Sequence, residues 1–545
     1  MSTKSSKGSR VISGFLALSI ANLFVKIVGL LLKIPLRSIL DDSGMAYYNN
    51  AYDIYAFLFT VSNVGMPTAV SMLVSENRAK GNVRESKRVL KIAVWLFLII
   101  GLIGTSIMFF GAPLFERAYK IDNSAYCIMA IAPTLLFICM ASAFKGYFQG
   151  YQHMIPSAIS NVIEALGKMA LGLLFASFAI KRGEPIHIVA AYATLGLTIG
   201  VAAGTLFLII RKLLFKPESF DTEYAEIQDA TLQTRSITKI VKLIFAIAIP
   251  ITLSSSVMTF SNMLDGIILS RQLQNIGYNQ EAVKDMIGNF KTCVTPISNI
   301  ILGIANPITS VVVPLISAAI ASNNIKKAKD SMNTTLRLAV IVLLPCIFGI
   351  SVLAEPIVAL LFGSDAAFQA APLLTVHVLS VFFMSMISVT AAFLQAHKLG
   401  KYPVYSVIVG AVVKIVTTAT LASVPSINIM GSPIASVFSC FVISVINFYF
   451  IRKHIGYTPN FGKLFVRPIF AALICALSAV GAYSLIMLLT DGIVPNETLM
   501  LSIFFAAIVY IVTVFMVKAI NREEVRLLPK GKKLEALLTK IKLLK

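Results

Sequence analysis

The stretch FKGYFQGYQHMIPSAISNVIEALGKM, from Phe144 to Met169, decides how the rest of this sequence is interpreted. Its second half is apolar enough for a membrane-spanning helix, yet it carries Glu164 and Lys168 one helical turn apart. An ionisable side chain at the centre of a bilayer costs about 2.5–3.5 kcal/mol on insertion scales, so such residues usually face protein or a watery cavity. We therefore expect this helix to turn a polar face towards the interior of a helical bundle.

The whole chain has the composition of a helical membrane protein. Of its 545 residues, 57% are hydrophobic and only 13% are charged, and the mean hydropathy is +0.83. Soluble domains carry about 25% charged residues, and a helix that crosses a membrane needs about 20 successive apolar residues. The apolar runs are long and lack the alternation of barrel strands. We expect an all-α polytopic membrane protein.

Fourteen spans are predicted, as two six-helix lobes followed by a C-terminal helix pair. A long polar interruption, Arg211 to Lys242, separates the first six spans from the last eight and reads as a cytoplasmic linker. The predicted domains are an N-terminal lobe, the linker, a C-terminal lobe, the last two spans and a basic tail, at residues 1–212, 213–242, 243–452, 453–519 and 520–545. The predicted spans are residues 11–39, 46–75, 92–110, 123–144, 156–180, 188–210, 243–270, 288–320, 338–354, 366–396, 402–424, 429–451, 468–489 and 498–517.

The distribution of basic residues predicts the orientation. Most of the 47 Lys and Arg residues lie in segments that are cytoplasmic when the N-terminus is inside. With an even number of spans, both termini are then cytoplasmic, and the net charge of +22 is mainly a topology signal rather than a nucleic-acid footprint. The C-terminal KKLEALLTKIKLLK predicts a basic amphipathic helix on the anionic inner leaflet, with a frayed, solvated tail as the alternative.

A weak internal repeat supports the division into two lobes. A glutamine, a proline and a lysine recur with the same Gln-to-Lys spacing, first as Gln149, Pro156 and Lys168, and then as Gln395, Pro403 and Lys414. Two lobes of shared topology are typical of alternating-access transporters, which bind substrate between their repeats.

Nine ionisable residues fall within the predicted spans. The six basic ones are assigned to substrate binding: Lys26, Lys33, Arg37, Lys168, Lys291 and Lys414. The three acidic ones are assigned to ion coupling or charge pairing: Asp53, Glu164 and Asp265. This excess of cations favours an anionic substrate such as a diphosphate, because Lys and Arg supply both charge and hydrogen-bond donors to oxyanions.

Several of these assignments have structural alternatives. The Glu164–Lys168 pair can simply neutralise itself as a packing device. Residues near the outer ends of their helices can extend to the membrane interface; these are Arg37, Asp265 and Lys291. A functional role is favoured for Lys26 and Lys414, which lie near mid-depth without an acidic neighbour at helical spacing.

Other kinds of chemistry lack a sequence signal. The six cysteines show no CxxC spacing, so neither a disulfide nor a metal site is expected. The sequence has no P-loop, zinc motif or nucleophile elbow. A membrane enzyme, such as a glycosyltransferase or ligase, is an alternative hypothesis. Such enzymes usually place acidic or histidine groups in sizeable loops outside the membrane, and the predicted outer loops of this chain are short. We expect no enzyme activity and no cofactor, with Na⁺ or H⁺ as the candidate coupling ions.

Two motifs resemble a known family. GMPTAVSMLVSE at residues 65–76 and GYFQGYQHMIPSAISNVIE at 146–164 are similar to signatures of polysaccharide-biosynthesis transporters, in the multidrug/oligosaccharidyl-lipid/polysaccharide (MOP) exporter superfamily. The likeness covers essentially the whole chain and extends to stage V sporulation protein B and to Gram-positive lipid II flippases of the MurJ type. It implies a fold like that of MurJ and of multidrug exporters of the MATE type.

The resemblance also implies a function and a site. It implies an alternating-access flippase of the bacterial plasma membrane, expected to be monomeric, that moves undecaprenyl-diphosphate-linked saccharide from the inner to the outer leaflet. Such flippases have a cationic cavity, and Lys291, five residues before Pro296, matches one of its basic positions. Lys26 and Lys33 correspond approximately to others.

The sequence departs from the family pattern and leaves the substrate open. Lysines stand where many members have arginines, and Asp53 falls where proline is common. Lipid II, teichoic, capsular and spore-cortex precursors are all compatible with the motifs. The alternative is a cation-coupled drug exporter of the same superfamily, in which Glu164 and Asp265 would hold the coupling ion.

Overall fold

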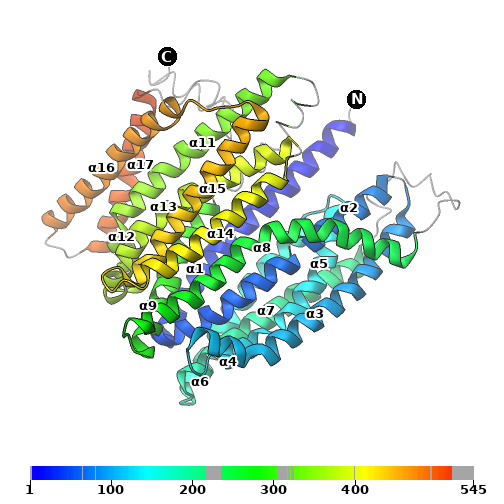
Figure 1. Ribbon diagram of the computed structural model, residues 1–545, viewed down its shortest axis with the longest axis horizontal. Coiled ribbons are helices and arrows are strands. Elements are labelled where there is room, and N and C mark those ends of the chain that lie inside the picture. The colour runs from blue at the N-terminus through cyan, green and yellow to red at the C-terminus, as the bar shows by residue number, and fades with distance from the viewer. Residues whose placement is uncertain are drawn as a thin grey trace. The chain divides into compact units, whose positions relative to one another are not determined.

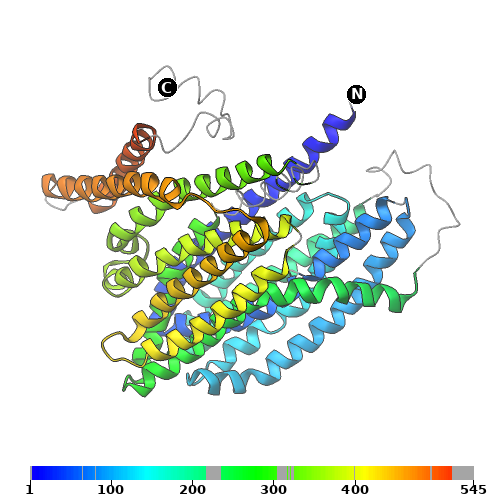
Figure 2. The same ribbon diagram turned by 45° about the horizontal axis from the view of Figure 1, so that its top comes forward.

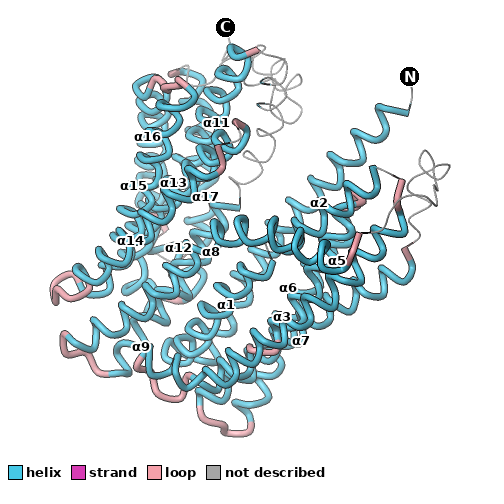
Figure 3. The backbone as a smooth tube through the Cα atoms, turned by 45° about the vertical axis from the view of Figure 1, so that its right-hand side comes forward, coloured by secondary structure: helices cyan, strands magenta, loops and turns pink. Residues whose placement is uncertain are grey.

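The structure is a computed structural model, and the part of the chain that it describes consists of helices joined by loops (Figure 3). The described residues are 3–63, 65–79, 81–215, 235–303, 316, 320, 324–397, 399–490 and 494–517. Three predicted features lie wholly or partly outside them: the basic tail at 520–545, most of the linker at 213–242 and the second half of the span at 288–320.

The chain forms two compact units. Unit 1 comprises residues Met1–Thr292 with Ser423–Pro425, and unit 2 comprises Cys293–Ala422 with Ser426–Lys545. Their common boundary lies in the π-helical turn η2, Phe290–Val294. The lobe boundaries derived from the sequence stay a prediction.

Unit 1 consists of nine labelled α-helices before η2 (Figure 1). They are α1 Thr3–Asn63, α2 Gly65–Ala79, α3 Val83–Tyr119, α4 Ala125–Ile131, α5 Thr134–Gly150, α6 Ile155–Lys181, α7 Ile186–Leu214, α8 Ile237–Asn275 and α9 Gln280–Asn289. Helix α1 packs against α6, α8 and α9, so that it is central to this unit.

Helix α1 is two helices joined at a break. Asp41 has φ 55° and ψ −178°, a left-handed φ that aspartate tolerates better than most residues. The break coincides with the boundary expected between the first two spans, 11–39 and 46–75. The second half of α1 therefore starts a new direction immediately after the DD pair at residues 41–42.

Helices α6 and α7 pack closely through glycines. A Cβ atom at Gly196 of α7 would overlap the backbone of Gly172 in α6, and one at Gly200 would lie 2.5 Å from the backbone nitrogen of Lys168. Small residues let helix backbones approach in membranes, where helix association depends on close packing. The glycines thereby hold the α6 helix that carries Glu164 and Lys168.

Unit 2 is also helical (Figures 1 and 2). Its labelled helices are α11 Ile325–Val352, α12 Ala354–Phe362, α13 Ser364–Ala396, α14 Lys401–Leu421, η3 Asn428–Met430, α15 Gly431–Ile455, η4 Gly462–Val466, α16 Arg467–Leu489 and α17 Pro495–Met516. Helix α13 packs against α11, α12 and α15, and α14 lies along α15 (Figure 2). Helices α16 and α17 pack against each other, as expected for the last helix pair.

The membrane class is confirmed. Among the described residues, ten helices are long and apolar enough to cross a membrane, or eleven when the bent pair Ile237–Leu253 and Ser255–Asn275 counts as one span. The ten do not include α1, where the first two spans are predicted, or the span at 288–320. The chain is a multi-pass membrane protein, and the number fourteen stays a prediction.

Candidate functional site

The candidate site of unit 1 lies where the two halves of α1 meet the turn η2. A Cβ atom at Gly288, just before η2, would overlap the carbonyl of Asp42, so the α9 end can approach the break in α1 only with glycine there. The turn itself is π-helical, and π-helical turns inside α-helices are often found at functional sites. This arrangement brings Lys291 to α1.

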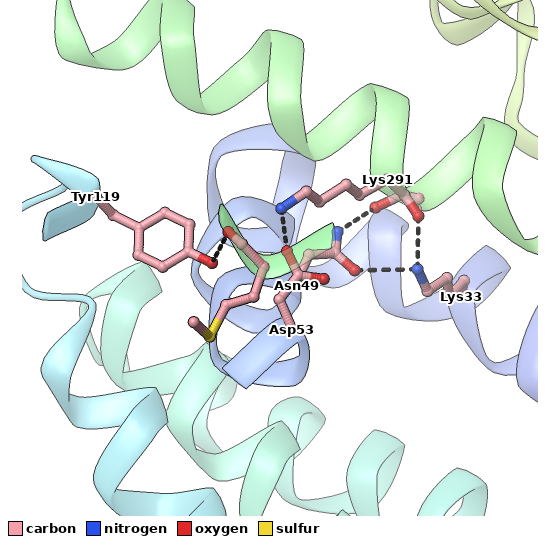
Figure 4. A network of polar contacts seen from close by, with 7 residues as sticks. Lys33, Asn49, Asp53, Tyr119 and Lys291 are labelled. Atoms are coloured by element: carbon pink, nitrogen blue, oxygen red, sulfur yellow. Dashed lines mark hydrogen bonds and ion pairs between the residues drawn. The ribbon is translucent and has the colours of Figure 1, made fainter. Parts of the chain in front are cut away.

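Lys33 joins the first half of α1 to the second half and to η2. Its Nζ donates to Asn49 Oδ1 at 3.0 Å and to the backbone carbonyl of Lys291 at 2.7 Å (Figure 4). Asn49 in turn donates from Nδ2 to Thr292 Oγ1 at 2.9 Å. One lysine therefore fixes the position of the backbone that carries a second lysine.

Lys291 forms an ion pair with Asp53 (Figure 4). Their side chains are 13% and 22% exposed, so the pair is neither sealed from water nor at the open surface. The Lys291 ammonium also lies 5.8 Å from the centre of the Tyr119 ring of α3. The pair neutralises one of the cations that the sequence analysis assigns to substrate.

Helix α8 approaches this ion pair at a glycine. A Cβ atom at Gly266 would lie 2.7 Å from Lys291 Nζ and 3.2 Å from Asp53 Oδ2. The adjacent residue, Asp265, is buried and close enough to Tyr119 to interact with it electrostatically, as Asp53 does. The structure therefore brings Lys33, Asp53 and Lys291 into one polar network, with Asp265 nearby in the same unit; we call Lys33, Asn49, Asp53, Lys291 and Thr292 the Lys291 network.

Arg37 has a separate partner at the break in α1. Its Nε and Nη2 each donate to a carboxylate oxygen of Asp42 at 2.7 Å, which is the two-pronged geometry of a strong arginine–carboxylate pair. Burial raises the pKa of Asp285 on α9, and the neighbouring charges of Asp42 and Glu281 raise it further. This end of unit 1 thus holds Arg37 among several carboxyl groups.

Glu164 and Lys168 lie on the α6 face that meets α1. Lys168 Nζ is 5.5 Å from the centre of the Tyr52 ring and interacts electrostatically with Tyr48 and Glu164. Glu164 also interacts with Lys145 of α5. These residues form a second polar region of unit 1, beside tyrosines of α1.

Helix α6 also contacts the first half of α1 through a pair of asparagines. Asn161 Nδ2 donates to Asn22 Oδ1 at 3.2 Å. Lys26, one turn beyond Asn22, is half-buried on the same helix. Its substrate role stays a prediction.

Lys414 lies in unit 2. It is 6% exposed on α14, where Ser439 of α15 donates to the Gly410 carbonyl at 2.7 Å one turn earlier. Both the polar environment expected for Lys414 and its role in substrate binding stay predictions.

Sequence analysis missed one intramembrane histidine. His377 lies in the middle of α13 and its Nδ1 is 3.0 Å from Ser298 Oγ. The sequence contains a signal for it, because His377 is an ionisable residue within the predicted span at 366–396.

A metal centre finds no support in the described part of the chain. Within those residues, no group of three or more His, Cys, Asp and Glu side chains is arranged to hold a metal ion. All six cysteines are free, and five of them are buried.

Family models and known proteins match this chain extensively. The family described as "Polysaccharide biosynthesis protein" matches residues 11–320, and the MatE family matches residues 291–420. The chain is 26% identical over 474 residues to the lipid II flippase MurJ of Bacillus subtilis (strain 168), covering 83% of this chain and 84% of that protein. It is 23% identical over 521 residues to stage V sporulation protein B of the same organism, covering 95% of this chain and 97% of that protein.

A solved structure shares the fold. The lipid II flippase MurJ in an inward closed conformation matches with a TM-score of 0.69 and 16% identity, over 92% of this chain and 98% of that chain. At this identity the match concerns the fold. Because the first family model covers more than half of the sequence, the chain belongs to the polysaccharide biosynthesis protein family, within the MOP superfamily of transporters.

Proposed function

We propose that this protein is a flippase that moves an undecaprenyl-diphosphate-linked saccharide, lipid II or a related cell-envelope precursor, from the inner to the outer leaflet. The observation that carries the proposal is the meeting of Lys33 and Lys291 in one network of a multi-pass membrane protein. Lys33 fixes the backbone of Lys291 and brings a second positive charge to it. Two ammonium groups in one network suit a diphosphate, which offers several oxygens to charged donors.

The relatives support the class of substrate. Both Bacillus proteins compared above are similar over at least 83% of this chain, and one of them is named a lipid II flippase. The similarity of this chain to that flippase favours a diphosphate-linked lipid over other anionic substrates. The relatives are transporters by name or family, and we propose transport without catalysis and without a cofactor.

The decisive experiment is complementation of bacterial cells depleted of their lipid II flippase. The wild-type chain should restore growth, while Lys291→Gln should fail or restore it poorly at equal membrane expression. Lys291→Arg keeps the charge and should restore partial growth. Glu281→Gln is the matched control, because it removes a charge from an exposed site on α9 outside the Lys291 network.

Failure of the well-expressed wild-type chain would redirect the proposal to another polyprenyl-linked glycan. Normal growth with every glutamine variant among Lys26, Lys33 and Lys291 would instead refute the cationic site. Lys33→Gln also removes the contact to the Lys291 carbonyl, and Lys291→Gln leaves Asp53 without its partner, so membrane expression and size-exclusion profiles are needed to separate transport from folding.

The second candidate function is a cation-coupled exporter of small molecules. It is favoured by the match to the MatE family and by the carboxylates of Asp53, Glu164 and Asp265 in unit 1. In that case Na⁺ or H⁺ would be the coupling ion. Cells that express the chain should then extrude cationic dyes in an ion-dependent way, whereas a flippase should leave dye uptake unchanged.

We further propose the plasma membrane of a bacterium as its location, with both termini in the cytoplasm, the basic tail on the anionic inner leaflet and a monomeric state. A cysteine placed within residues 215–235 should react with an impermeant reagent only from the cytoplasmic side. One placed at Asn279 should react only from outside. Reaction of both from the same side would contradict this topology.

A further inference from the structure

The ion pair between Asp53 and Lys291 raises a problem for substrate binding. Lys291 can offer its full charge to a diphosphate only when Asp53 no longer holds it. The backbone of Lys291 is meanwhile fixed by Lys33, whose Nζ lies 2.7 Å from the Lys291 carbonyl. The long Lys291 side chain can therefore change partners while its backbone stays in position.

The immediate surroundings of Asp53 contain few other charges. Lys291 faces Asp53 from η2, and Tyr119 faces it from α3. Helix α8 approaches it at Gly266, next to Asp265, where a Cβ atom would lie 3.2 Å from Asp53 Oδ2. Further charged or titratable residues on helices packed against α1 interact with groups other than Asp53. On α6 and α5, Lys168 lies over the Tyr52 ring, and Glu164 interacts with Tyr55 and Lys145. On α9 and α7, Lys284 donates to the Tyr47 hydroxyl, Asp285 interacts with Asp42, and His187 lies beside the Tyr47 ring.

Substrate binding changes the charge balance at this place. In the substrate-free network, the Asp53 carboxylate neutralises Lys291. A diphosphate brings further negative charge to the same ammonium, and the displaced carboxylate then faces both phosphate oxygens and the nearby Asp265. Like charges in a half-buried site favour the protonated form of a carboxyl group. Uptake of one proton removes one of the negative charges that the substrate adds.

We propose that Asp53 is a proton-binding site linked to substrate: when a diphosphate takes Lys291, Asp53 leaves the ion pair and accepts one proton from water. On release of the lipid, Lys291 returns to Asp53 and the proton leaves. The carboxylate gains an O–H bond as a hydronium ion in solution loses one, and no other covalent bond changes. This inference rests on the proposed function and adds to it a second ligand, H⁺, with a named residue.

The test measures protons and binding together. The purified full-length chain is titrated in weakly buffered detergent solution with a short-chain prenyl-diphospho-N-acetylglucosamine, and a pH dye reports proton uptake. Both phosphates of this probe are esterified, so its own charge stays constant over the pH range used. The wild-type protein should take up a proton on binding, approaching one proton per bound probe at the pH of greatest uptake.

Binding should also depend on pH with a defined sign. Because the bound state holds the extra proton, affinity should rise as the pH falls, by up to about tenfold per pH unit for one linked proton. Asp53→Asn cannot take up this proton and leaves Lys291 without its carboxylate. Its affinity should be independent of pH over this range and several-fold higher than that of the wild type near neutral pH.

Two further variants complete the design. Asp53→Glu keeps a carboxyl group and should retain proton uptake, which maintains the test if Asp53→Asn does not fold. Glu281→Gln removes an exposed carboxylate from α9 and should behave as the wild type. Size-exclusion profiles of all variants report folding independently of binding.

The outcomes separate this inference from the proposed function. Probe binding by the wild type without proton uptake would overturn the role of Asp53 and leave the flippase proposal standing. Weaker binding by a well-folded Asp53→Asn would also overturn it, since the carboxylate would then help to hold the substrate. If both the wild type and Asp53→Asn are well folded and neither binds the probe, the proposed diphosphate substrate itself is wrong.

Discussion

The two copies of the internal repeat adopt the same local structure but place different chemistry on it. In unit 1, α5 ends at Gly150 and α6 begins at Ile155; in unit 2, α13 ends at Ala396 and α14 begins at Lys401. Each second helix has a proline near its start, where the missing N–H group costs least. The repeated lysines follow at the same position of these helices.

The difference lies one turn before each lysine. Glu164 precedes Lys168 on α6, whereas Gly410 precedes Lys414 on α14. A Cβ atom at Gly410 would overlap the buried side chain of Ile443, so this position serves the packing of α14 against α15. A repeated backbone therefore leaves each unit free to use a given position for charge or for packing.

The largest effect is expected from placing the first copy's residue into the second. Gly410→Glu should yield little folded protein, because the new side chain meets Ile443 in the α14–α15 contact. The reciprocal Glu164→Gly should still fold, at a helix cost of about 1 kcal/mol. Membrane expression and size-exclusion profiles measure both.

Steric and charge effects at Gly410 are separable. Gly410→Leu should also fail, whereas Gly349→Leu on α11 should fold, since nothing lies within 4 Å of the Cβ position at Gly349. A monodisperse Gly410→Glu protein at wild-type expression would refute the packing role.

The double variant Glu164→Gln with Lys168→Met tests the charges of the first copy. We expect a folded protein that loses most of its transport, because both groups line the polar face of α6 beside Tyr52. Lipid flipping at matched expression is the measurement. Preserved flipping would mean that the two charges only neutralise each other.

The matching lysine of the second copy should have a graded effect. Lys414→Gln should lower transport several-fold or more, since hydrogen bonds to charged partners contribute about 1.5–3 kcal/mol each. Lys414→Arg should retain part of the activity because the charge remains. Equal transport by wild type and Lys414→Gln would make this buried lysine a structural residue.

The smallest expected effect concerns the turn of the first copy. His153 stacks on Phe215 with ring centres 5.8 Å apart, and burial, together with the nearby Arg211, lowers the pKa of His153. Below the usual histidine value of 6.5, the unfolded chain binds a proton that the folded chain resists, so stability falls as the pH drops.

His153→Gln should therefore reduce the loss of thermal stability between pH 7.5 and 5.5. The second copy differs here too, because His397 Nδ1 donates to the Phe393 carbonyl at 2.8 Å. A His153→Gln protein with an unchanged pH dependence of its thermal midpoint would contradict the expectation.

Much of the site could be predicted, because charge in an apolar helix is conspicuous. Lys33, Asp53 and Lys291 stand out as charges within predicted apolar spans, and the structure joins them in one network. The partners of these residues could not be predicted in the same way. Asp53 pairs with a residue 238 positions away, and no local periodicity encodes such a contact.

The sequence by itself determined the class of this protein: its hydropathy requires helices in a membrane, since backbone groups in lipid must be satisfied within each segment. Its motifs also determined the family. Only the tertiary structure decided which charges meet, because that depends on the break at Asp41, on the π-helical turn at Lys291 and on the glycines that admit close approach. These are properties of packed helices. Because of them, Lys291, which the sequence marks only as one of six cations, is paired with the carboxylate of Asp53.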